Sequence, residues 1–337
     1  MDMRINGPLP GRLRRQPMPR RIEWDIVVIG GANTDYVIRG PRLPAPSETV
    51  RGETFRQAPG GKGANQALAA ARLGARSALV ARLGRDDRAH EIVTRLERER
   101  VNTHHLTHDH AAPTGIALIM VDRHGEKQIL TLPGANYQFN LDDVYAAAGM
   151  ISSCRVLIMQ LEVPLKCLMA AAHIAREAGV MIVLNPSPPI ALPDELLRLT
   201  DVIRINAREA TVLTGEQVHD RDSARRAAEL LLERGVGAVA IQAGQDGNLI
   251  LWPHHEAWLP KLPVSTVDTT GAGAAFSAAL AVALAEGRSL EEAGPFANAA
   301  AALATTKLGA QAGLPQRRAV QALMDHVHAE HFDWNNS

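Results

Sequence analysis

The segment Val267–Leu280 reads Val-Asp-Thr-Thr-Gly-Ala-Gly-Ala-Ala-Phe-Ser-Ala-Ala-Leu. Gly271 and Gly273 can adopt backbone angles that other residues resist, so successive amide groups there can point toward one place. The Ala-rich run that follows has high helix propensity, and a helix beginning here presents unpaired N–H groups and the positive end of its dipole. The segment is therefore typical of a cradle for an anion such as a phosphate group, although a glycine turn before a buried helix has the same pattern.

A second glycine cluster lies far upstream. It reads Gly-Gly-Lys-Gly-Ala-Asn-Gln-Ala over residues 60–67 and leads into a predicted helix that ends at Gly74. Because the residues around Lys62 are small, its ammonium group can approach a ligand closely. This cluster, together with Asp268 before the downstream glycines, favours a binding function over a simple turn.

Strands and helices alternate along the chain. The predicted strands are 26–29, 78–80, 156–159, 180–184, 202–205 and 238–242, and the predicted helices are 89–99, 165–177 and 222–234. This alternation is typical of an α/β fold with a mostly parallel, doubly wound sheet and helices on both of its faces. Two additional pairs of short strands predict a small antiparallel sheet: 36–38 with 49–52, and 116–121 with 128–131.

The two glycine motifs, in this order and at this separation, make the chain resemble the ribokinase family of carbohydrate kinases from roughly Asp25 to Met324. The resemblance implies ATP-dependent phosphorylation of a sugar hydroxyl. It also implies that the two strand pairs, at about 36–58 and 114–132, form a lid over the sugar that often serves as a homodimer interface. Pro133-Gly134-Ala135-Asn136 and Met159-Gln160-Leu161-Glu162 favour D-ribose, with ribose 5-phosphate as the product.

The resemblance assigns roles to individual residues. The sugar would be held by Asn33, Asp35, Gly61, Lys62, Asn65 and Glu162, and the anion hole would be formed by Gly271, Ala272 and Gly273. The family has its catalytic base, an Asp, where this chain has Ala274. A methyl group cannot accept a proton, so we expect impaired activity.

The resemblance also implies three cofactors: ATP, Mg²⁺ and K⁺. The nucleotide would be bound by Asn206, Gln242, Gly244, Gly247 and Asn298. Mg²⁺ would be held near Glu209, directly or through water, although Asn206 and Glu209 also have the spacing of a helix capping box. The monovalent cation would be held by Asp268, Thr270, Ala304, Gly309 and Gly313, the last replacing a common Ser.

The composition sets limits on partners and compartment. The 337 residues include 36 basic and 36 acidic ones, so no net field favours nucleic acid or an anionic membrane. The sequence contains no run of 18 or more apolar residues, as a membrane-spanning helix would need. Residues 1–21 are rich in Arg and Pro and lack the apolar core of a secretory signal, which predicts a disordered basic arm. Cys154 and Cys167, in apolar surroundings, favour a reducing cytoplasm.

These patterns predict one kinase domain over residues 22–330, followed by a tail at 331–337. Three functions remain open for it: a ribose kinase impaired at Ala274, a nucleoside kinase of the same family, or a catalytically inactive protein that binds a sugar or nucleotide. A nucleoside would require an apolar slot for its base. Ala274 itself is either natural or a replacement introduced into an active enzyme.

Overall fold

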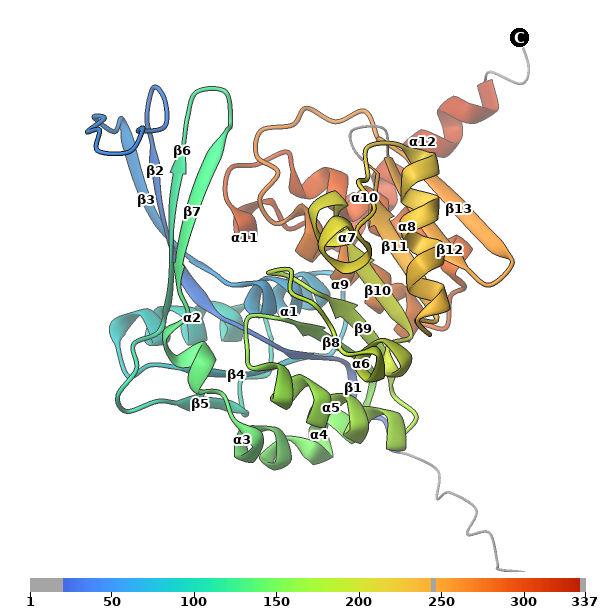
Figure 1. Cartoon of the computed structure of the whole chain (residues 1–337), viewed down its shortest axis with the longest axis horizontal. Coiled ribbons are helices and arrows are strands. Elements are labelled where there is room, and N and C mark those ends of the chain that lie inside the picture. The colour runs from blue at the N-terminus through green and yellow to red at the C-terminus, as the bar shows by residue number, and fades with distance from the viewer. Residues whose placement is uncertain (1–20, 244–246, 334–337) are drawn as a thin grey trace, which may run out of the picture.

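The computed structural model describes residues 21–243 and 247–333, with side chains as far as Val327 (Figure 1). A large sheet with helices on both faces forms the body of the protein, and a small sheet projects from it. Nearly all of the predicted basic arm, Gly244 and the last residues of the predicted tail lie outside the described residues.

The large sheet has nine strands in the order β13-β12-β11-β10-β9-β8-β1-β4-β5. Their bounds are β1 Trp24–Ile29, β4 Ser77–Leu83, β5 Leu106–His108, β8 Cys154–Gln160, β9 Met181–Asn185, β10 Val202–Ile205, β11 Ala238–Gln242, β12 Gly247–Trp252 and β13 His255–Pro260. The strands from β5 to β11 are parallel, whereas β12 and β13 form an antiparallel edge. Each predicted strand of this sheet is present, and the predicted α/β class is confirmed.

Two buried apolar clusters lie on opposite faces of the large sheet. One face carries α1 Lys62–Arg72, α2 Asp87–Arg98, α9 Ala272–Ala285, α10 Leu290–Ala304 and α12 Arg317–Asp333. The other carries α3 Leu141–Ala146, α4 Ala148–Ser152, α5 Leu165–Glu177, α6 Asp194–Leu199, α7 Ala207–Thr214 and α8 Arg221–Glu233. Among the described residues, no helix is long and apolar enough to cross a membrane.

Helix α9 lies between α1 and α10 and is buried along most of its length. Its side chains are mostly Ala, so neighbouring helices can approach its backbone closely. Because helices follow strands in this fold, its first turn lies beside the carboxyl ends of the parallel strands, where open α/β sheets bind ligands.

The small sheet, which we call the lid, has the strand order β3-β2-β6-β7. Its strands are β2 Asn33–Arg39, β3 Thr54–Gly60, β6 Gly115–Val121 and β7 Lys127–Leu132. Both hairpins are antiparallel, as predicted, but β2 and β6 pair in parallel, so the sheet as a whole is mixed rather than antiparallel.

The lid strand predicted at 49–52 is wrong. The register pairs Asn33 with Gly60 and Arg39 with Thr54, so residues 40–53 are left as a connection between β2 and β3. This connection contains three prolines, which cannot donate to a strand ladder. Arg42 and Ala45 both donate hydrogen bonds to the carboxylate of Glu48, which folds the connection onto itself.

Candidate active site

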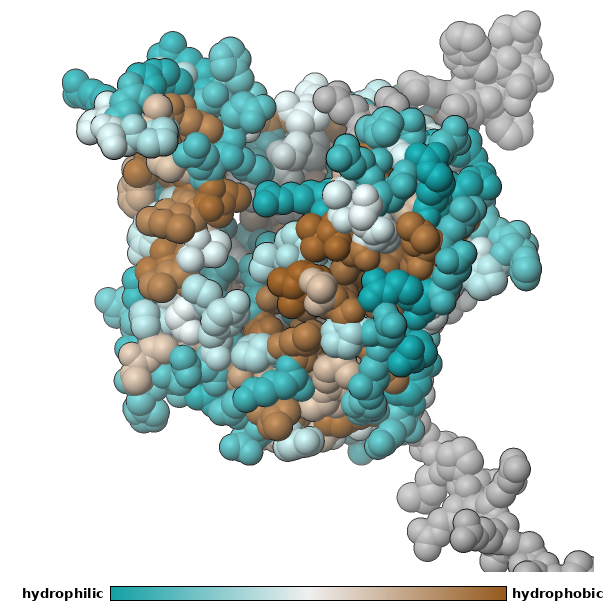
Figure 2. Space-filling view, in the orientation of Figure 1, coloured by the Kyte–Doolittle hydropathy of each residue, from teal (hydrophilic) through white to brown (hydrophobic). Residues whose placement is uncertain are grey.

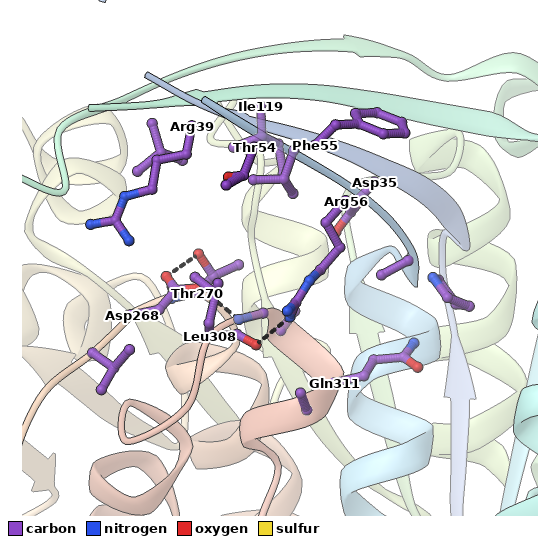
Figure 3. A pocket seen from close by; sticks show the side chains of 18 of the residues that line it. Asp35, Arg39, Thr54, Phe55, Arg56, Ile119, Asp268, Thr270, Leu308 and Gln311 are labelled. Carbon is purple, nitrogen blue, oxygen red and sulfur yellow. Dashed lines mark hydrogen bonds between the residues drawn. The ribbon is translucent and has the colours of Figure 1, made fainter. Parts of the chain in front are cut away.

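A cavity of about 980 Å³ lies between the inner face of the lid and the loops that precede α9 and α11 (Ala310–Gly313) (Figure 3). Alternate residues of β2 and β3 line it, because every second side chain of a strand points to the same face: Asp35, Val37, Arg39, Thr54, Arg56 and Ala58. Facing them are Asp268, Thr270, Leu308, Gly309 and Gln311.

Two contacts connect the lid to these loops. Lys127 Nζ, on β7, donates a hydrogen bond to Thr270 Oγ1 at 3.2 Å. Arg56 Nη1, on β3, donates to the carbonyl oxygen of Leu308 at 3.3 Å. The lid therefore contacts the body of the protein across the cavity, in addition to the place where the lid strands join the body.

The predicted sugar-binding residues are brought together around the start of α1, and we call them the Lys62 cluster: Asn33, Asp35, Gly61, Lys62, Asn65 and Glu162. Glu162 holds Lys62 at two points. Its Oε2 accepts the backbone N–H of Lys62 at 2.7 Å, and its Oε1 is 3.5 Å from Lys62 Nζ. Gly61 has a φ of 87°, and a Cβ there would lie 2.6 Å from Ala32 Cα, so glycine is required.

Two amide side chains complete the cluster. Asn136 Nδ2 donates to Asn33 Oδ1 at 2.7 Å, and Asn136 Oδ1 accepts the N–H of Ala32 at 3.0 Å. Asn136 is 2% exposed and orients Asn33, a role that the sequence analysis did not assign to it. Asn65 Oδ1 is buried and accepts no hydrogen bond from any residue that the structure describes, which leaves an acceptor for a ligand hydroxyl.

Asp35 is the member of the Lys62 cluster that lines the cavity. Its carboxyl group lies over Gly60, where a Cβ would be 2.2 Å from Asp35 Oδ2. Burial, together with the negative charge of Glu162, raises the pKa of Asp35 to about 7 against the opposing effect of Lys62. Asp35 therefore changes its charge near neutral pH.

The predicted anion hole is the start of α9, and we call Gly271, Ala272, Gly273 and Ala274 the α9 cradle. Gly271 has a φ of 91°, and a Cβ there would lie 2.7 Å from the carbonyl oxygen of Ala310. Among the described residues, the amides of Gly271, Gly273 and Ala274 donate to no backbone acceptor, and no side chain caps the helix. The cradle thus presents three free N–H donors.

Of the predicted cation-binding residues, Asp268 and Thr270 lie in the loop before α9 and Gly309 directly precedes α11, while Ala304 and Gly313 are the last residues of α10 and α11. Asp268 Oδ1 accepts from the backbone and hydroxyl of Thr270, and Oδ2 accepts the N–H of Gly309 at 2.9 Å. Burial opposes the ionisation of Asp268, but these hydrogen bonds outweigh it and hold its pKa below the ordinary value. A Cβ at Gly313 would be 2.1 Å from the carbonyl oxygen of Ala304, so a Ser side chain would not fit at 313 without a shift.

Asn206 and Glu209 form the capping box of α7. Asn206 Oδ1 accepts the N–H of Glu209, and Glu209 Oε2 accepts the N–H of Asn206, both at 2.9 Å. Glu209 is nevertheless left with Oε1, which accepts no hydrogen bond among the described residues. The capping role, which the sequence pattern also indicated, is thus present, and one carboxylate oxygen remains for a water or an ion.

The other predicted nucleotide-binding residues lie around the edge strands of the large sheet. Asn298 accepts from Asn248 Nδ2 at 2.9 Å and donates to the carbonyl oxygen of Pro260 at 2.8 Å, so its amide connects α10 to β12 and β13. A Cβ at Gly247 would be 2.3 Å from the carbonyl oxygen of Leu259. Gln242 is exposed at the end of β11.

Arg204 lies beside the α9 cradle and was missed by the sequence analysis. Its Nη1 is 2.7 Å from the position that a Cβ of Gly273 would occupy. The signal that could have found it is a charged residue within the apolar strand β10, where a buried position is expected for every side chain.

The chain is similar to known proteins along most of its length. The family model described as "pfkB family carbohydrate kinase" matches residues 24–317. The ribokinase of Haemophilus influenzae is 38% identical over 302 residues, covering 90% of this chain and 99% of its own length. The ribokinase of Mus musculus is 38% identical over 301 residues, covering 87% and 92%.

Solved structures give the same result. The structure of Arabidopsis thaliana ribokinase complexed with ribose and ATP has a TM-score of 0.81 at 31% identity, covering 89% of this chain and 98% of that one. Ribokinase from Cryptococcus neoformans in complex with ADP has a TM-score of 0.77 at 27% identity, covering 88% and 98%. The chain therefore belongs to the pfkB family of carbohydrate kinases and is a sugar kinase of the ribokinase type, transferring phosphate to an alcohol group.

Proposed function

We propose that this protein phosphorylates D-ribose with ATP to give ribose 5-phosphate. The main support is that two complementary groups of residues adjoin one cavity, which is lined by Asp35 of the first group and by Thr270, next to the second. The Lys62 cluster offers carboxylate, amide and ammonium groups, which suit a polyhydroxylated sugar. The α9 cradle offers free N–H donors for phosphate. The relatives named ribokinase, and the neighbour bound to ribose and ATP, support the same substrates.

The residue at position 274 determines the rate of phosphoryl transfer that we expect. Its side chain is buried at the start of α9, where the family resemblance has a catalytic Asp, and a methyl group cannot remove the proton of the attacking hydroxyl. The N–H groups of the cradle are retained, so charge on the transferring phosphoryl group is still stabilised. We therefore propose slow transfer with nearly normal binding of sugar and nucleotide.

The residues present fit the cofactors that the family resemblance implies. Glu209 Oε1 would hold Mg²⁺ through water, since Mg²⁺ usually retains several waters. The carboxylate of Asp268 and carbonyl groups of the adjoining loop are all oxygen ligands and would hold K⁺, with Gly313 contributing only its backbone. When bound, Mg²⁺ would neutralise negative charge on the phosphates, and K⁺ would help to fix the loop beside the cradle.

Calorimetric titration tests the substrate. We expect a clear heat of binding when ribose or ATP is titrated into the protein, and a smaller heat of binding with 2-deoxyribose, hexoses and nucleosides. Two other functions remain as outcomes of the test. Preferential binding of a nucleoside would identify a nucleoside kinase. Tight binding of ribose and ATP without any ribose-dependent ADP release would identify a binding protein, which the buried methyl group of Ala274 favours as the second candidate.

We also propose a homodimer formed through the outer face of the lid. Five large apolar side chains point away from the cavity and are 46–69% exposed: Ile38, Phe55, Leu118, Leu130 and Leu132. Figure 2 shows hydrophobic surface over the lid strands, and a second lid would cover it. Light scattering should give twice the chain mass for the wild type and one chain mass for Leu130→Glu. Ile190→Glu, at another exposed apolar residue, should remain a dimer.

We propose a cytoplasmic location because of the two cysteines. The sequence has two cysteines, Cys154 and Cys167, and both are buried in the apolar cluster on one face of the large sheet, which suits a reducing compartment.

A further inference from the structure

Arg204 is a buried cation without a counter-ion. It is 8% exposed, and the structure gives its guanidinium group no hydrogen bond and no ion pair within the described ranges 21–243 and 247–333. Burial lowers the pKa of Arg204, with the charge of Glu209 acting in the opposite direction. Arginine nevertheless stays charged at neutral pH, so a largely buried positive charge has no protein acceptor for its N–H groups among the described residues.

The guanidinium group is directed at the α9 cradle. Its central carbon lies 5.6 Å from the ring centroid of Phe276, on the first turns of α9. Its Nη1 would be 2.7 Å from a Cβ at Gly273, which means that the absence of a side chain at 273 makes room for it. The strand that carries it is fixed as well, because the carbonyl oxygen of Arg204 accepts Asn185 Nδ2 at 3.0 Å.

The surrounding groups do not neutralise this charge. Glu209 is the carboxylate that acts on Arg204 most, but its Oε2 is used in the capping box of α7, and it forms no ion pair with Arg204. Gly273, whose Cβ position would lie 2.7 Å from Arg204 Nη1, and the following Ala274 have free N–H donors at the positive end of the helix dipole. Arg204 and the cradle thus form one unsatisfied, electropositive site.

We propose that Arg204 is a further catalytic residue, which binds the terminal phosphate of ATP together with the N–H groups of the α9 cradle. This proposal rests on the proposed kinase function and extends it. Without a ligand the charge is unpaired, and an anion with several oxygen atoms supplies acceptors for both the guanidinium and the amides. A terminal phosphate has three such oxygens, whereas ADP leaves this part of the site empty.

In the transfer step, the bond from the sugar oxygen to the γ-phosphorus forms, and the bond from that phosphorus to the bridging oxygen breaks. The bond electrons stay with the departing ADP, and the hydroxyl proton passes to water, since Ala274 cannot accept it. Arg204 offsets the charge on the oxygens of the transferring group and takes no proton itself.

The test compares ATP and ADP binding by calorimetry in the wild type, Arg204→Met and Arg204→Lys. We expect Arg204→Met to weaken ATP binding by about 10–100-fold, the scale of one charge-assisted hydrogen bond or two, and ADP binding only a few-fold. Arg204→Lys should lose less ATP affinity than Arg204→Met. Because the wild-type charge is unpaired, Arg204→Met should also raise the unfolding temperature of the ligand-free protein.

The matched control is Arg82→Met. Arg82 is a partly buried arginine whose guanidinium is paired with Asp109 and Asp143 at 3.1 and 2.9 Å. This variant should lower the unfolding temperature and leave the ratio of ATP to ADP affinity unchanged. If Arg204→Met binds ATP like the wild type, or loses ATP and ADP affinity equally with a lower unfolding temperature, Arg204 is structural and the proposal is overturned. If the wild type binds neither nucleotide, the kinase function itself is overturned as well.

Discussion

Asp35 of the Lys62 cluster and Thr270, which directly precedes the α9 cradle, line the same cavity, but the charges of the two groups are balanced in different ways. In the Lys62 cluster, Glu162 pairs with the ammonium and amide groups of Lys62, and Asn136 pairs with Asn33. At the cradle, the free amides of α9 and the guanidinium of Arg204 have no acceptor among the described residues. The charge of Lys62 is thus balanced by Glu162 without a ligand, whereas among the described residues no anion balances the charge at the cradle.

This difference in charge balance indicates how the binding of the sugar and the binding of the phosphate should each affect the protein. A sugar that enters the Lys62 cluster meets side chains that are already oriented, so little ordering is required on binding. A phosphate that enters the cradle neutralises a charge whose burial destabilises the folded protein. Neutralising this charge should therefore contribute to the affinity for the nucleotide, whereas sugar affinity benefits from the low cost of ordering the side chains.

The largest effect is expected from giving the cradle the base that it lacks. Ala274→Asp should raise kcat by about 10²–10⁴-fold, the usual contribution of general-base catalysis, and should change KM little. The carboxylate would lie at the start of α9, where the helix dipole favours its ionised form. Ribose-dependent ADP release by both proteins, measured side by side, checks this.

Ala275→Asp, one position farther along α9, is the control and should not gain activity. If Ala274→Asp is no faster than the wild type, either the base lies elsewhere or the protein functions by binding alone.

A second variant blocks the cradle without adding charge. Gly273→Val would place a side chain 2.7 Å from Arg204 Nη1 and fill the space for phosphate. We expect ATP affinity to fall by about 10–100-fold, as for the loss of charge-assisted hydrogen bonds, while ribose affinity is preserved. Calorimetric titrations with ribose and with ATP, carried out separately, distinguish an effect on the Lys62 cluster from an effect on the α9 cradle.

Gly149→Ala, where a Cβ would meet nothing within 4 Å, controls for the loss of a glycine within a helix. Normal ATP binding by Gly273→Val would mean that the phosphate lies outside the cradle.

The fold was largely predictable because it depends on patterns within short segments. The buried strands of the large sheet are continuous apolar runs, and α5, β10 and β11 have the predicted bounds. The lid was less predictable, since the position of β3 depends on the pairing of Asn33 with Gly60 across a long connection. A local pattern contains no information about such a register.

The candidate site could also be predicted from the sequence only as far as local patterns define it. The glycines that define it carry a clear local signal, and their roles are visible as close approaches, such as Gly61 to Ala32. The partners of those residues come from distant segments: Asn136 reaches Asn33 from beyond the second lid hairpin, and Arg204 reaches Gly273 from β10. These partner residues are identified by their burial and by their short distances to the glycines and to Asn33, which are defined only once the chain has folded.

The smallest predicted effect concerns pH and the Lys62 cluster. Asp35 in the free protein has a pKa of about 7, and sugar hydroxyls donate hydrogen bonds to its ionised form. Binding therefore favours loss of the proton, so ribose affinity should increase as the pH rises through 7 and level off near pH 8. At pH 6 only about one molecule in eleven has Asp35 ionised, which predicts about tenfold weaker binding than at pH 8.

Calorimetry with ribose between pH 6 and 8 measures this slope. Asp35→Asn should bind ribose with little dependence on pH, because an amide does not titrate in this range. His90 is another polar side chain that lines the cavity, so His90→Gln is the matched control and should keep the wild-type slope. A slope that vanishes in His90→Gln, or an affinity that falls as the pH rises, would contradict the role of Asp35 as an ionised acceptor. ATP affinity should change much less over the same range, because the guanidinium of Arg204 and the amides of α9 keep their protons throughout.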